Sequence, residues 1–412
     1  MHQSHLTPAS EHTMLSTTAR PLIEATVPVL LANGEAITRH FYQRMFTHHP
    51  ELKNLFNMGN QASGNQAQAL AGAVYAYATH MDQPQTMAPA LNRIAQKHVS
   101  LGITPAQYTI VGRHLLASLG EVLGAAITPD IAEAWDEVYW LMATDLIARE
   151  ARIYQTLRWE AGQAWPEVRV VQREAASADT VALTLQALPG HSLPDFLAGQ
   201  YLSVAVPIAD TGLTQVRQYS FSDAPGQGLW RITVKREVAS ADAPAGQVSN
   251  HLHDNVQVGD VLRVGLPAGD FHLQGGTRPL VMLSAGVGIT PMVSMLRHLA
   301  AHSPEQAVIF AHACADREHM PHRSEVQACV QAMPQARLHL WLETCEPLDE
   351  GQARGGRMDL SQIDALPSDA DVFLCGPLPF MQAQRRWLLA NGVPRDRIHH
   401  EVFGPDLFAE LH

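Results

Sequence analysis

Two glycine-containing turns near the C-terminal end of the sequence have the composition of a phosphate-binding site. Residues 284–291, Ser-Ala-Gly-Val-Gly-Ile-Thr-Pro, follow the short apolar run 280–283. Glycines let a backbone approach phosphate oxygens closely, and a helix that begins at Pro291 would offer them its positive end. The spacing differs from G-x-G-x-x-G. Residues 375–377, Cys-Gly-Pro, end a later apolar run, where ligands gather in parallel sheets.

Three segments further upstream combine a cation, hydroxyl groups and the start of a helix. Residues 217–220, Arg-Gln-Tyr-Ser, lie on a predicted strand, 199–201 (Gly-Gln-Tyr) precede it, and 246–250 (Gly-Gln-Val-Ser-Asn) open a predicted short helix. The free N–H groups and the dipole of such a helix suit a phosphate. An R-x-Y-S pattern alone is a weak signal, but the three segments together favour a ligand site over ordinary strands and turns.

His98 lies on the apolar face of a predicted helix. A lone histidine in such a place is more often a hydrogen-bonded core residue than a ligand. Its neighbours in the sequence favour a ligand: 40–46 (His-Phe-Tyr-Gln-Arg-Met-Phe) lead to 49–58, which contain His-Pro-Glu-Leu. Gln66, Leu70, Lys97, Tyr108 and Glu150 follow in order. This pattern resembles the globin domain of the flavohaemoglobins over residues 15–158.

The resemblance implies a haem b site in which His98 is the proximal ligand of the iron. It also implies that Lys97 belongs to the haem-binding segment and that Phe56 packs against the porphyrin. Tyr108 and Glu150 match a pair that hydrogen-bonds behind the proximal imidazole. An imidazole that donates to a carboxylate pushes electron density toward iron, so Glu150 is chemically suited to this role.

Tyr42, Gln66 and Leu70 match the residues over the distal face of the haem in that family. A phenol such as Tyr42, assisted by Gln66, can hydrogen-bond the negative charge that develops on dioxygen in an apolar pocket. Leu70 and Val111 would keep water out. The alternative for Tyr42 is a buried core tyrosine.

The three upstream segments resemble the FAD site of ferredoxin-reductase-type flavoproteins. In those proteins the arginine of R-x-Y-S contacts the flavin pyrophosphate, and the tyrosine and serine contact the isoalloxazine. The FAD-binding residues that this resemblance implies are Tyr201, Arg217, Gln218, Tyr219, Ser220, Gln247, Val248 and Ser249.

The glycine loop resembles the G-x-G-x-T-P loop of the same reductases, which receives a nicotinamide dinucleotide. The residues implied are Gly286, Val287, Gly288, Ile289, Thr290 and Pro291, with Cys375, Gly376 and Pro377. Cys375 could be a nucleophile, but without His or Asn context a small residue beside the nicotinamide is preferred. A closing motif whose aromatic residue covers the flavin is matched by Glu401, Val402, Phe403, Gly404 and Pro405.

The choice between NADH and NADPH stays open. After the second strand of the last domain, Asp316 favours a free ribose hydroxyl and Arg317 favours a phosphate. We lean to NADH.

The periodicity of apolar residues predicts a multidomain chain. About six helices in residues 15–158 indicate an all-α globin domain. Short alternating runs in 159–274 indicate an antiparallel β-barrel FAD domain, and strands that alternate with helices in 275–412 indicate a doubly wound α/β nicotinamide-binding domain. Residues 1–14 are polar and are predicted to be a disordered extension.

Composition excludes several classes of protein. The 412 residues carry 28 Lys and Arg against 40 Asp and Glu, a net charge of −12 that gives no general attraction to nucleic acid or anionic membranes. Four cysteines without C-x-x-C spacing exclude a disulfide scaffold and a cysteine zinc site. The N-terminus lacks a secretory signal, and the uncharged stretch 279–296 is better explained by a strand, a glycine turn and a helix start than by a membrane span. We therefore expect a cytoplasmic protein, and a monomer.

The resemblance implies an NAD(P)H-dependent nitric oxide dioxygenase, which converts NO and O₂ to nitrate. Nicotinamide gives electrons in pairs, haem iron accepts them singly, and a flavin does both, so FAD must lie between the two. One alternative is an O₂-binding or gas-sensing protein, but a sensor needs an output domain, and storage needs no distal Tyr–Gln pair. The other is an NAD(P)H:flavin or ferric reductase whose haem is secondary.

Overall fold

A computed structural model describes residues 15–56, 65–81, 83–240, 244–345, 351–364 and 366–404, with the side chains of 65–68 and 84 outside the description. The predicted N-terminal extension, 1–14, therefore lies outside the described residues. The chain forms two compact units. The first comprises Met1–Glu51, Gln61–Ala95 and Thr104–Ala151, and the second comprises Leu52–Asn60, Gln96–Ile103 and Arg152–His412.

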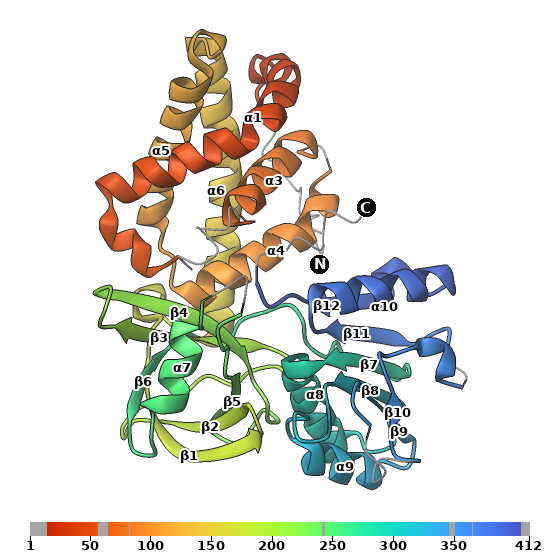
Figure 1. The fold of residues 1–412 in the computed structure, drawn as a ribbon. Coiled ribbons are helices and arrows are strands. Elements are labelled where there is room, and N and C mark those ends of the chain that lie inside the picture. The colour runs from red at the N-terminus through yellow and green to blue at the C-terminus, as the bar shows by residue number, and fades with distance from the viewer. Residues whose placement is uncertain are drawn as a thin grey trace, which may run out of the picture. The chain divides into compact units, whose positions relative to one another are not determined.

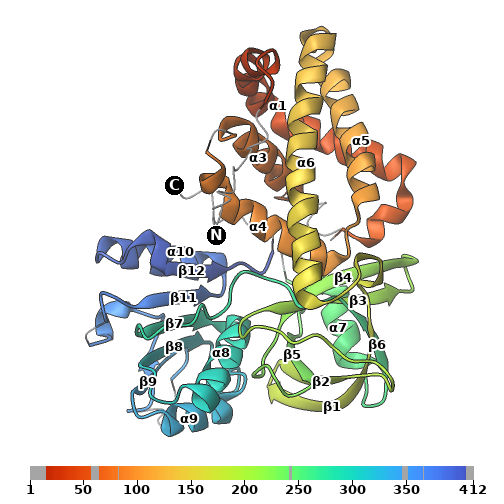
Figure 2. The ribbon, with the colours of Figure 1, turned by 180° about the vertical axis from the view of Figure 1, so that it is seen from behind.

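Helices build the first unit (Figures 1 and 2). They are α1 (Ala19–His48), α3 (Asn65–Thr79), α5 (Pro105–Leu123) and most of α4 (Pro84–Leu101) and α6 (Pro129–Leu157), with the short 3₁₀ helix η2 (Gly124–Ala126). The C-terminal turns of α4 and α6 and most of the 3₁₀ helix η1 (Pro50–Asn54) belong to the second unit. Thr104 and Gln107 form a capping box at the start of α5, so the backbone N–H groups there are satisfied. The Thr128 hydroxyl accepts from the Ile131 N–H at the start of α6. A threonine followed by proline, at 104–105 and at 128–129, predicts both of these helix starts from the sequence.

The helical spacing of apolar residues predicts two separate helices, over 22–31 and 37–46, but both stretches lie in one helix, α1. Asn33 lies between them, and its side-chain amide donates to the Val29 carbonyl one turn earlier, so the polar residue is accommodated within the helix. Gly34 faces α3, where a Cβ would lie 3.3 Å from the Cβ of Ala71. Neither residue therefore ends the helix, and the glycine allows the close α1–α3 packing.

Six antiparallel strands form the barrel lobe of the second unit, in the order β4-β3-β6-β1-β2-β5. They are β1 (Glu167–Ser177), β2 (Thr180–Ala187), β3 (Tyr201–Ile208), β4 (Leu213–Ser220), β5 (Leu229–Lys235) and β6 (Val261–Val264). The 3₁₀ helix η3 (Ala161–Gln163) lies between α6 and β1. A bridge between Phe221 and Ile232 links the ends of the sheet. The helix α7 (Gln247–Asp254) packs against β3, β4 and β5.

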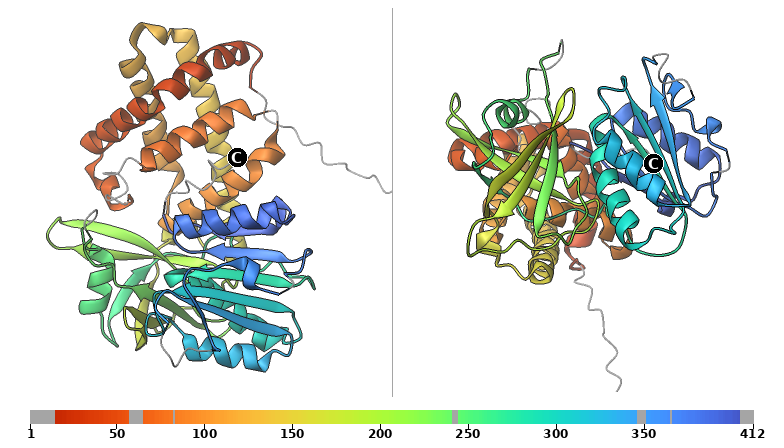
Figure 3. Two further views of the ribbon diagram at one scale, coloured as in Figure 1. Left: turned by 45° about the vertical axis from the view of Figure 1, so that its right-hand side comes forward. Right: turned by 90° about the horizontal axis from the view of Figure 1, so that it is seen from below.

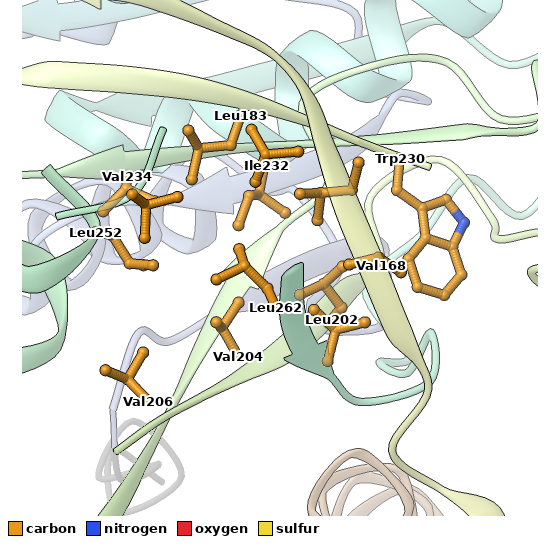
Figure 4. Packing of buried hydrophobic residues seen from close by; sticks show 14 of the residues in the cluster. Val168, Leu183, Leu202, Val204, Val206, Trp230, Ile232, Val234, Leu252 and Leu262 are labelled. Carbon is orange, nitrogen blue, oxygen red and sulfur yellow. The ribbon is translucent and has the colours of Figure 1, made fainter. Parts of the chain in front are cut away.

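The core of the barrel lobe comes from alternate residues of its strands, as Figure 4 shows. Val204, Leu183 and Ile232 are fully buried there, and Leu252 of α7 joins them. Burial of apolar side chains from strands far apart in sequence holds the strands in register. It thereby fixes the positions of the polar residues on their other faces.

The parallel-sheet lobe is the rest of the second unit, with strand order β10-β9-β8-β7-β11-β12. Its strands are β7 (Leu280–Ala285), β8 (Val308–Cys314), β9 (Ala336–Leu342), β10 (Arg354–Gly355), β11 (Asp371–Cys375) and β12 (Ile398–Glu401). Its helices are α8 (Ile289–His302), α9 (Arg323–Ala332) and α10 (Leu378–Ala390), with η4 (Gly286–Gly288), η6 (Leu360–Gln362) and η7 (Arg395–Arg397). Helices cover both faces of the sheet (Figure 3). This is the predicted doubly wound arrangement.

The uncharged stretch 279–296 folds as a strand, a turn and a helix start, as predicted. It supplies β7, η4 and the first turns of α8, which begins at Ile289 rather than at Pro291. In the part of the chain that the structure describes, no helix is long and apolar enough to span a bilayer.

Candidate functional site

The segments predicted to bind FAD lie side by side in the barrel lobe. Strands β3 and β4 pair so that Tyr201 is directly opposite Ser220. Alternation along β4 places Arg217 and Tyr219 on one face and Gln218 and Ser220 on the other. The register therefore brings together two of the three predicted segments.

Burial sets the electrostatics of these residues. It lowers the pKa of the Arg217 guanidinium and raises the pKa of the Tyr219 phenol. Burial, followed by the negative charge of Glu401, raises the pKa of Tyr201. The Ser220 hydroxyl is buried without a hydrogen-bond partner among the described residues. A half-buried cation and a buried orphan hydroxyl suit a ligand that carries phosphate and polar ring atoms.

The third segment opens α7, as expected. Gly246 is its N-cap, and the Gly246 N–H donates to the Glu237 carbonyl at 2.9 Å. Burial is the main cause of the raised pKa of Tyr219; Arg217 lowers this pKa and the charge of Glu237 raises it, so Glu237 lies near Tyr219. The start of α7, with Gln247, Val248 and Ser249, therefore belongs to the same part of the lobe as 217–220. Its free N–H groups suit a phosphate.

The two glycine turns meet at the carboxyl edge of the parallel sheet. Strands β7 and β11 are neighbours, with Ser284 opposite Cys375. A Cβ on Gly288 would lie 2.5 Å from the Cys375 carbonyl oxygen, so only glycine fits there. Gly286 has a φ of +54° and open space around it. Backbone N–H groups and space at a helix start are what a diphosphate needs.

The rest of both turns is packed inside the lobe. Ile289, Thr290 and Pro291 are buried, and the Thr290 hydroxyl donates to the Val287 carbonyl at 3.0 Å. Cys375 is fully buried, and burial raises the pKa of its thiol, which disfavours a nucleophilic thiolate. This supports the preferred interpretation of Cys375 as a small residue of the turn that continues through Gly376 and Pro377.

The closing motif begins next to this edge. Glu401 ends β12, directly opposite Cys375 of β11. Its charge raises the pKa values of both Cys375 and Tyr201, after burial in each case, so it lies near both predicted ligand regions. Phe403 is exposed. Val402 and Gly404 follow the strand, and Pro405 lies outside the described residues.

The segment that carries His98 is attached to the barrel lobe within the second unit. His98 is half-buried near the end of α4, and Lys97 beside it is exposed. The Gln218 amide donates to the Ser100 hydroxyl at 3.0 Å, and the Gly269 N–H donates to the Gln96 side-chain oxygen at 3.0 Å. The predicted haem ligand is thus two residues from a serine that binds the predicted flavin motif.

Phe56, the predicted porphyrin contact, belongs to the second unit as well. It is half-buried and follows η1 by two residues. The Thr214 N–H at the start of β4 donates to the side-chain oxygen of Asn54 at 2.8 Å. The segments of Phe56 and of His98 are therefore both held by strand β4.

Tyr108 and Glu150 form a buried pair in the first unit. The Tyr108 hydroxyl donates to a carboxylate oxygen of Glu150, and Tyr139 donates to the Tyr108 carbonyl. Burial, then the charge of Glu150, raises the pKa of Tyr108 far above its ordinary value. The predicted Tyr–Glu partnership is present. Its role behind the imidazole of His98 stays a prediction.

Three of the predicted distal residues can be described in part. Tyr42 is buried in α1, with its ring 4.8 Å from that of Phe41 and 5.8 Å from that of Phe46, measured between centroids. Leu70 is half-buried in α3. Gln66 lies in α3, and its side chain is outside the description. Their placement over a haem stays a prediction.

We expect Tyr108→Phe to lower the unfolding free energy of the first unit by about 1–3 kcal/mol, because a buried carboxylate loses a donor. Urea unfolding monitored by the far-ultraviolet signal of the helices would measure this. Thr144→Val is a matched control, since the Thr144 hydroxyl is exposed and bonds only its own helix. Equal stabilities of Tyr108→Phe and the unchanged chain would contradict the assigned bond.

Ser100, Gln96 and Asn54 were absent from the sequence-based set. Each is a common polar residue, and its partner is far away in the sequence, so no local pattern marks it. The sequence marks Ser100 alone, and only by its place two residues after the candidate ligand His98. Edge strand β12, which places Glu401, was also missed, since 398–401 (Ile-His-His-Glu) lacks an apolar run.

Asp316, one of the two candidates for nucleotide selection, is engaged locally. Its carboxylate accepts from the N–H groups of Glu318 and His319 and from the His319 ring. The His319 hydrogen bond lowers the pKa of Asp316, in spite of slight burial. Arg317 reaches the Gln352 side chain at 3.4 Å. Neither arrangement decides between NADH and NADPH.

Comparison with known proteins places a family model on each predicted domain. The model described as Globin matches residues 39–146, Oxidoreductase FAD-binding domain matches 167–273, and Oxidoreductase NAD-binding domain matches 282–386. Each match falls inside one of the predicted domains. The predicted domain boundaries themselves stay a proposal.

A curated flavohemoprotein from Bordetella parapertussis is 47% identical over 403 residues, which is 95% of this chain and 99% of that relative. The chain belongs to the flavohemoprotein family. The resemblance seen in the sequence and the three-part fold class are thereby confirmed. Like other flavohemoproteins, the chain joins a globin domain to an oxidoreductase.

Two solved structures agree with this membership. A flavohemoglobin from Malassezia yamatoensis, described with bound FAD and heme, has a TM-score of 0.85 and 33% identity, and the match covers 95% of this chain and 100% of that one. The flavohem-like FAD/NAD-binding domain of a nitric oxide dioxygenase from Vibrio cholerae has a TM-score of 0.55 and 35% identity. The match covers 59% of this chain and 100% of the Vibrio cholerae chain.

Proposed function

We propose that this flavohemoprotein is an NAD(P)H-dependent nitric oxide dioxygenase that converts NO and O₂ to nitrate with haem b and FAD. The observation that carries the proposal is the bond between Gln218 of the flavin motif and Ser100, two residues from His98. It joins a candidate iron ligand to a candidate flavin site. The Vibrio cholerae structure, which is part of a nitric oxide dioxygenase, supports the same activity.

The residues fit the three cofactors. The orphan Ser220 hydroxyl and the half-buried Arg217 suit FAD. The open space at Gly286 and the close turn at Gly288 suit a nicotinamide dinucleotide. Glu150, only 3% exposed and hydrogen-bonded to Tyr108, offers the carboxylate that orients an imidazole in haem proteins.

When bound, NAD(P)H supplies two electrons as hydride, FAD accepts the pair and passes electrons on singly, and haem iron takes them one at a time. Arg217 and the start of α7 hold the FAD diphosphate, and Tyr219 and Ser220 orient its ring. Gly286 and Gly288 admit the dinucleotide, and Glu401 and Phe403 close over the flavin. His98 anchors the iron, Phe56 and Lys97 hold the porphyrin, and the bond from Gln218 to Ser100 keeps this anchor on the barrel lobe.

The globin residues supply the environment for the substrates. Tyr42 donates a hydrogen bond to dioxygen, with Gln66 assisting, and Leu70 excludes water. NO and O₂ are small and uncharged, so an apolar path suffices and no cationic site is needed. Each nitrate takes one electron, so the stoichiometry couples two NO molecules to each NAD(P)H.

Tyr42→Phe is expected to release O₂ faster and to slow NO turnover, because the phenol no longer holds the bound oxygen. A single hydrogen bond to a charged acceptor corresponds to about 1.5–3 kcal/mol, or roughly tenfold to hundredfold in the O₂ off-rate. Stopped-flow displacement of O₂ by carbon monoxide would measure it. An unchanged off-rate would refute the assigned bond. Phe46→Leu, beside Tyr42 but without a hydroxyl, is the control.

Purified protein tests the proposal in two steps. The absorbance spectrum reports bound haem and FAD, and NADH-driven NO removal in air, with nitrate assayed, reports the activity. A colourless protein, or one that oxidises NADH without consuming NO, would contradict the proposal. The second outcome would favour the alternative flavin or ferric reductase. We further propose a cytoplasmic location and a monomeric state.

A further inference from the structure

An ionic network joins the barrel lobe to the parallel-sheet lobe inside the second unit. Its centre is Glu325 in the first turn of α9. Arg231 of β5 donates to both oxygens of the Glu325 carboxylate, at 3.1 and 2.9 Å. Arg297 of α8 donates to it at 2.7 Å, and the His322 ring lies 2.7 Å from its other oxygen. One carboxylate therefore binds two guanidinium groups and an imidazole from both lobes.

The network continues to the end of the flavin motif. Arg231 also donates to the Ser222 carbonyl, and Arg297 donates to a carboxylate oxygen of Asp223 at 2.6 Å. The Ser294 hydroxyl of α8 donates to the Asp223 carbonyl at 2.7 Å. Ser222 and Asp223 follow the predicted flavin motif by two and three residues. The parallel-sheet lobe is thus tied to the stretch of backbone that carries Ser220.

The β1–β2 hairpin makes a second set of contacts with the parallel-sheet lobe, which we call the seam. The Ala178 N–H donates to the Glu318 carbonyl at 2.9 Å, and the His322 N–H donates to the Ala176 carbonyl at 3.2 Å. The other ring nitrogen of His322 lies 2.7 Å from the Thr233 hydroxyl of β5. His322 holds a φ of +54°, which non-glycine residues seldom adopt. His322 therefore makes contacts at the seam with both ring nitrogens and with its backbone N–H.

The two lobes also share an apolar contact. Ala198 lies between β2 and β3 of the barrel lobe, and Phe271 follows its last strand, β6. Both belong to one buried cluster with Met295 of α8. Apolar contact is non-directional, so this cluster alone does not fix the rotation of one lobe against the other. Paired guanidinium–carboxylate bonds are directional, so they fix orientation. A cleft of about 540 Å³, lined by 174–176, Ala182 and 322–325, among others, leaves open space beside the seam.

We propose that Glu325 is a positioning residue, which fixes the rotation between the two lobes and so the approach of the nicotinamide to the flavin. This inference rests on the proposed function. The step that it serves is the transfer of a hydride, one proton with two electrons, from NADH to FAD, which leaves NAD⁺ and reduced FAD. Such a transfer needs the reacting atoms within about 3–3.5 Å, and a displacement of about 1 Å can cost roughly a hundredfold in rate.

Glu325 is ionised at neutral pH. Burial opposes its ionisation, but the hydrogen bonds from His322 and Arg231 outweigh burial and lower its pKa to about 2. A neutral amide in its place accepts fewer bonds and leaves two guanidinium groups without a charged partner.

The test compares Glu325→Gln with the unchanged FAD-loaded protein in single-turnover reduction by NADH. We expect the rate of flavin reduction to fall about tenfold or more with the Kd for NADH nearly unchanged. We also expect a larger isotope effect with deuterium at the transferred position, and faster hydrogen exchange at the N–H groups of Ala178 and His322. Glu325→Asp, which keeps the charge, should recover part of the rate.

Asp254→Asn is the matched control, because it breaks an exposed ion pair with Arg236 inside the barrel lobe alone. It should leave rate, isotope effect and exchange unchanged. If Glu325→Gln does not fold, Arg297→Lys takes its place with the same expectations in smaller measure.

The outcomes separate the two proposals. If NADH does not reduce the flavin of the unchanged protein, the proposed function fails. If the unchanged protein is reduced normally and Glu325→Gln matches it in rate and in amide exchange, the positioning role is overturned. A Glu325→Gln protein with lower thermal stability but an unchanged rate and isotope effect would likewise overturn it, because Glu325 would then only stabilise the fold.

Discussion

His98→Ala is expected to abolish NO consumption while NADH-dependent reduction of ferricyanide continues. The imidazole is the proposed anchor of the iron, whereas the barrel and parallel-sheet lobes have cores of their own, so the reductase half should survive the loss. The haem absorbance band should disappear, and the flavin absorbance should stay. Nitrate assay, ferricyanide assay and absorbance on one preparation would measure all three.

His339→Ala is a control for the loss of an imidazole elsewhere, because His339 lies on β9 of the parallel-sheet lobe, outside the residues that match the globin model. It should keep haem and NO consumption. If His98→Ala keeps its haem and its NO consumption, the assignment of the iron ligand is wrong. If both NO consumption and ferricyanide reduction vanish while both cofactors stay bound, the separation of roles between the domains is wrong.

Gly288→Ala should damage the nicotinamide site severely. The added Cβ would lie 2.5 Å from the carbonyl oxygen of Cys375 and 2.8 Å from the Cα of Gly376. Both contacts are with backbone atoms, which cannot turn aside as a side chain can. Overpacking of this kind costs about 1–3 kcal/mol, and it pushes apart the two turns that should receive the dinucleotide. We expect a lower melting temperature and a KM for NADH raised about tenfold or more.

Gly355→Ala is the matched control in the same lobe. It adds the same methyl group in open space at β10, at a backbone position without a positive φ. Steady-state kinetics with NADH and ferricyanide, together with thermal unfolding, would compare the two variants. Equal KM values for Gly288→Ala and Gly355→Ala would contradict the proposed role of the 284–291 turn.

The sequence predicted the fold class because each domain has its own period of apolar residues. Alternating runs at 168–171, 181–185, 201–206, 216–222, 230–234 and 261–264 predict the barrel strands, and each run overlaps a strand. Apolar runs at 280–283, 308–311, 338–342 and 372–374 predict β7, β8, β9 and β11 in the same way. The short edge strands β10 and β12 carried no such signal, since a strand at the edge of a sheet is only partly buried. Asn33 and Gly34 are poor helix formers, so they look like a break in α1. The helix continues because the Asn33 amide bonds the Val29 carbonyl of the same helix and Gly34 packs against Ala71 of α3.

The site was predictable where chemistry demands particular residues at fixed spacing. Glycine turns and the R-x-Y-S segment have local patterns, and the register of β3 with β4 and of β7 with β11 brings them together. The Gln218–Ser100 bond and the Glu325 network depend on residues far apart in the sequence. A pairwise contact of this kind leaves no trace in a single sequence, so the structure was needed to find it.

The ratio of nitrate formed to NADH consumed, measured in air with NO supplied to the haem- and FAD-loaded protein, tests the central claim most directly. If electrons leave NADH in pairs and reach the iron held by His98 singly, the ratio is two nitrate ions for each NADH. A ratio near zero, or nitrite in place of nitrate, would contradict the account.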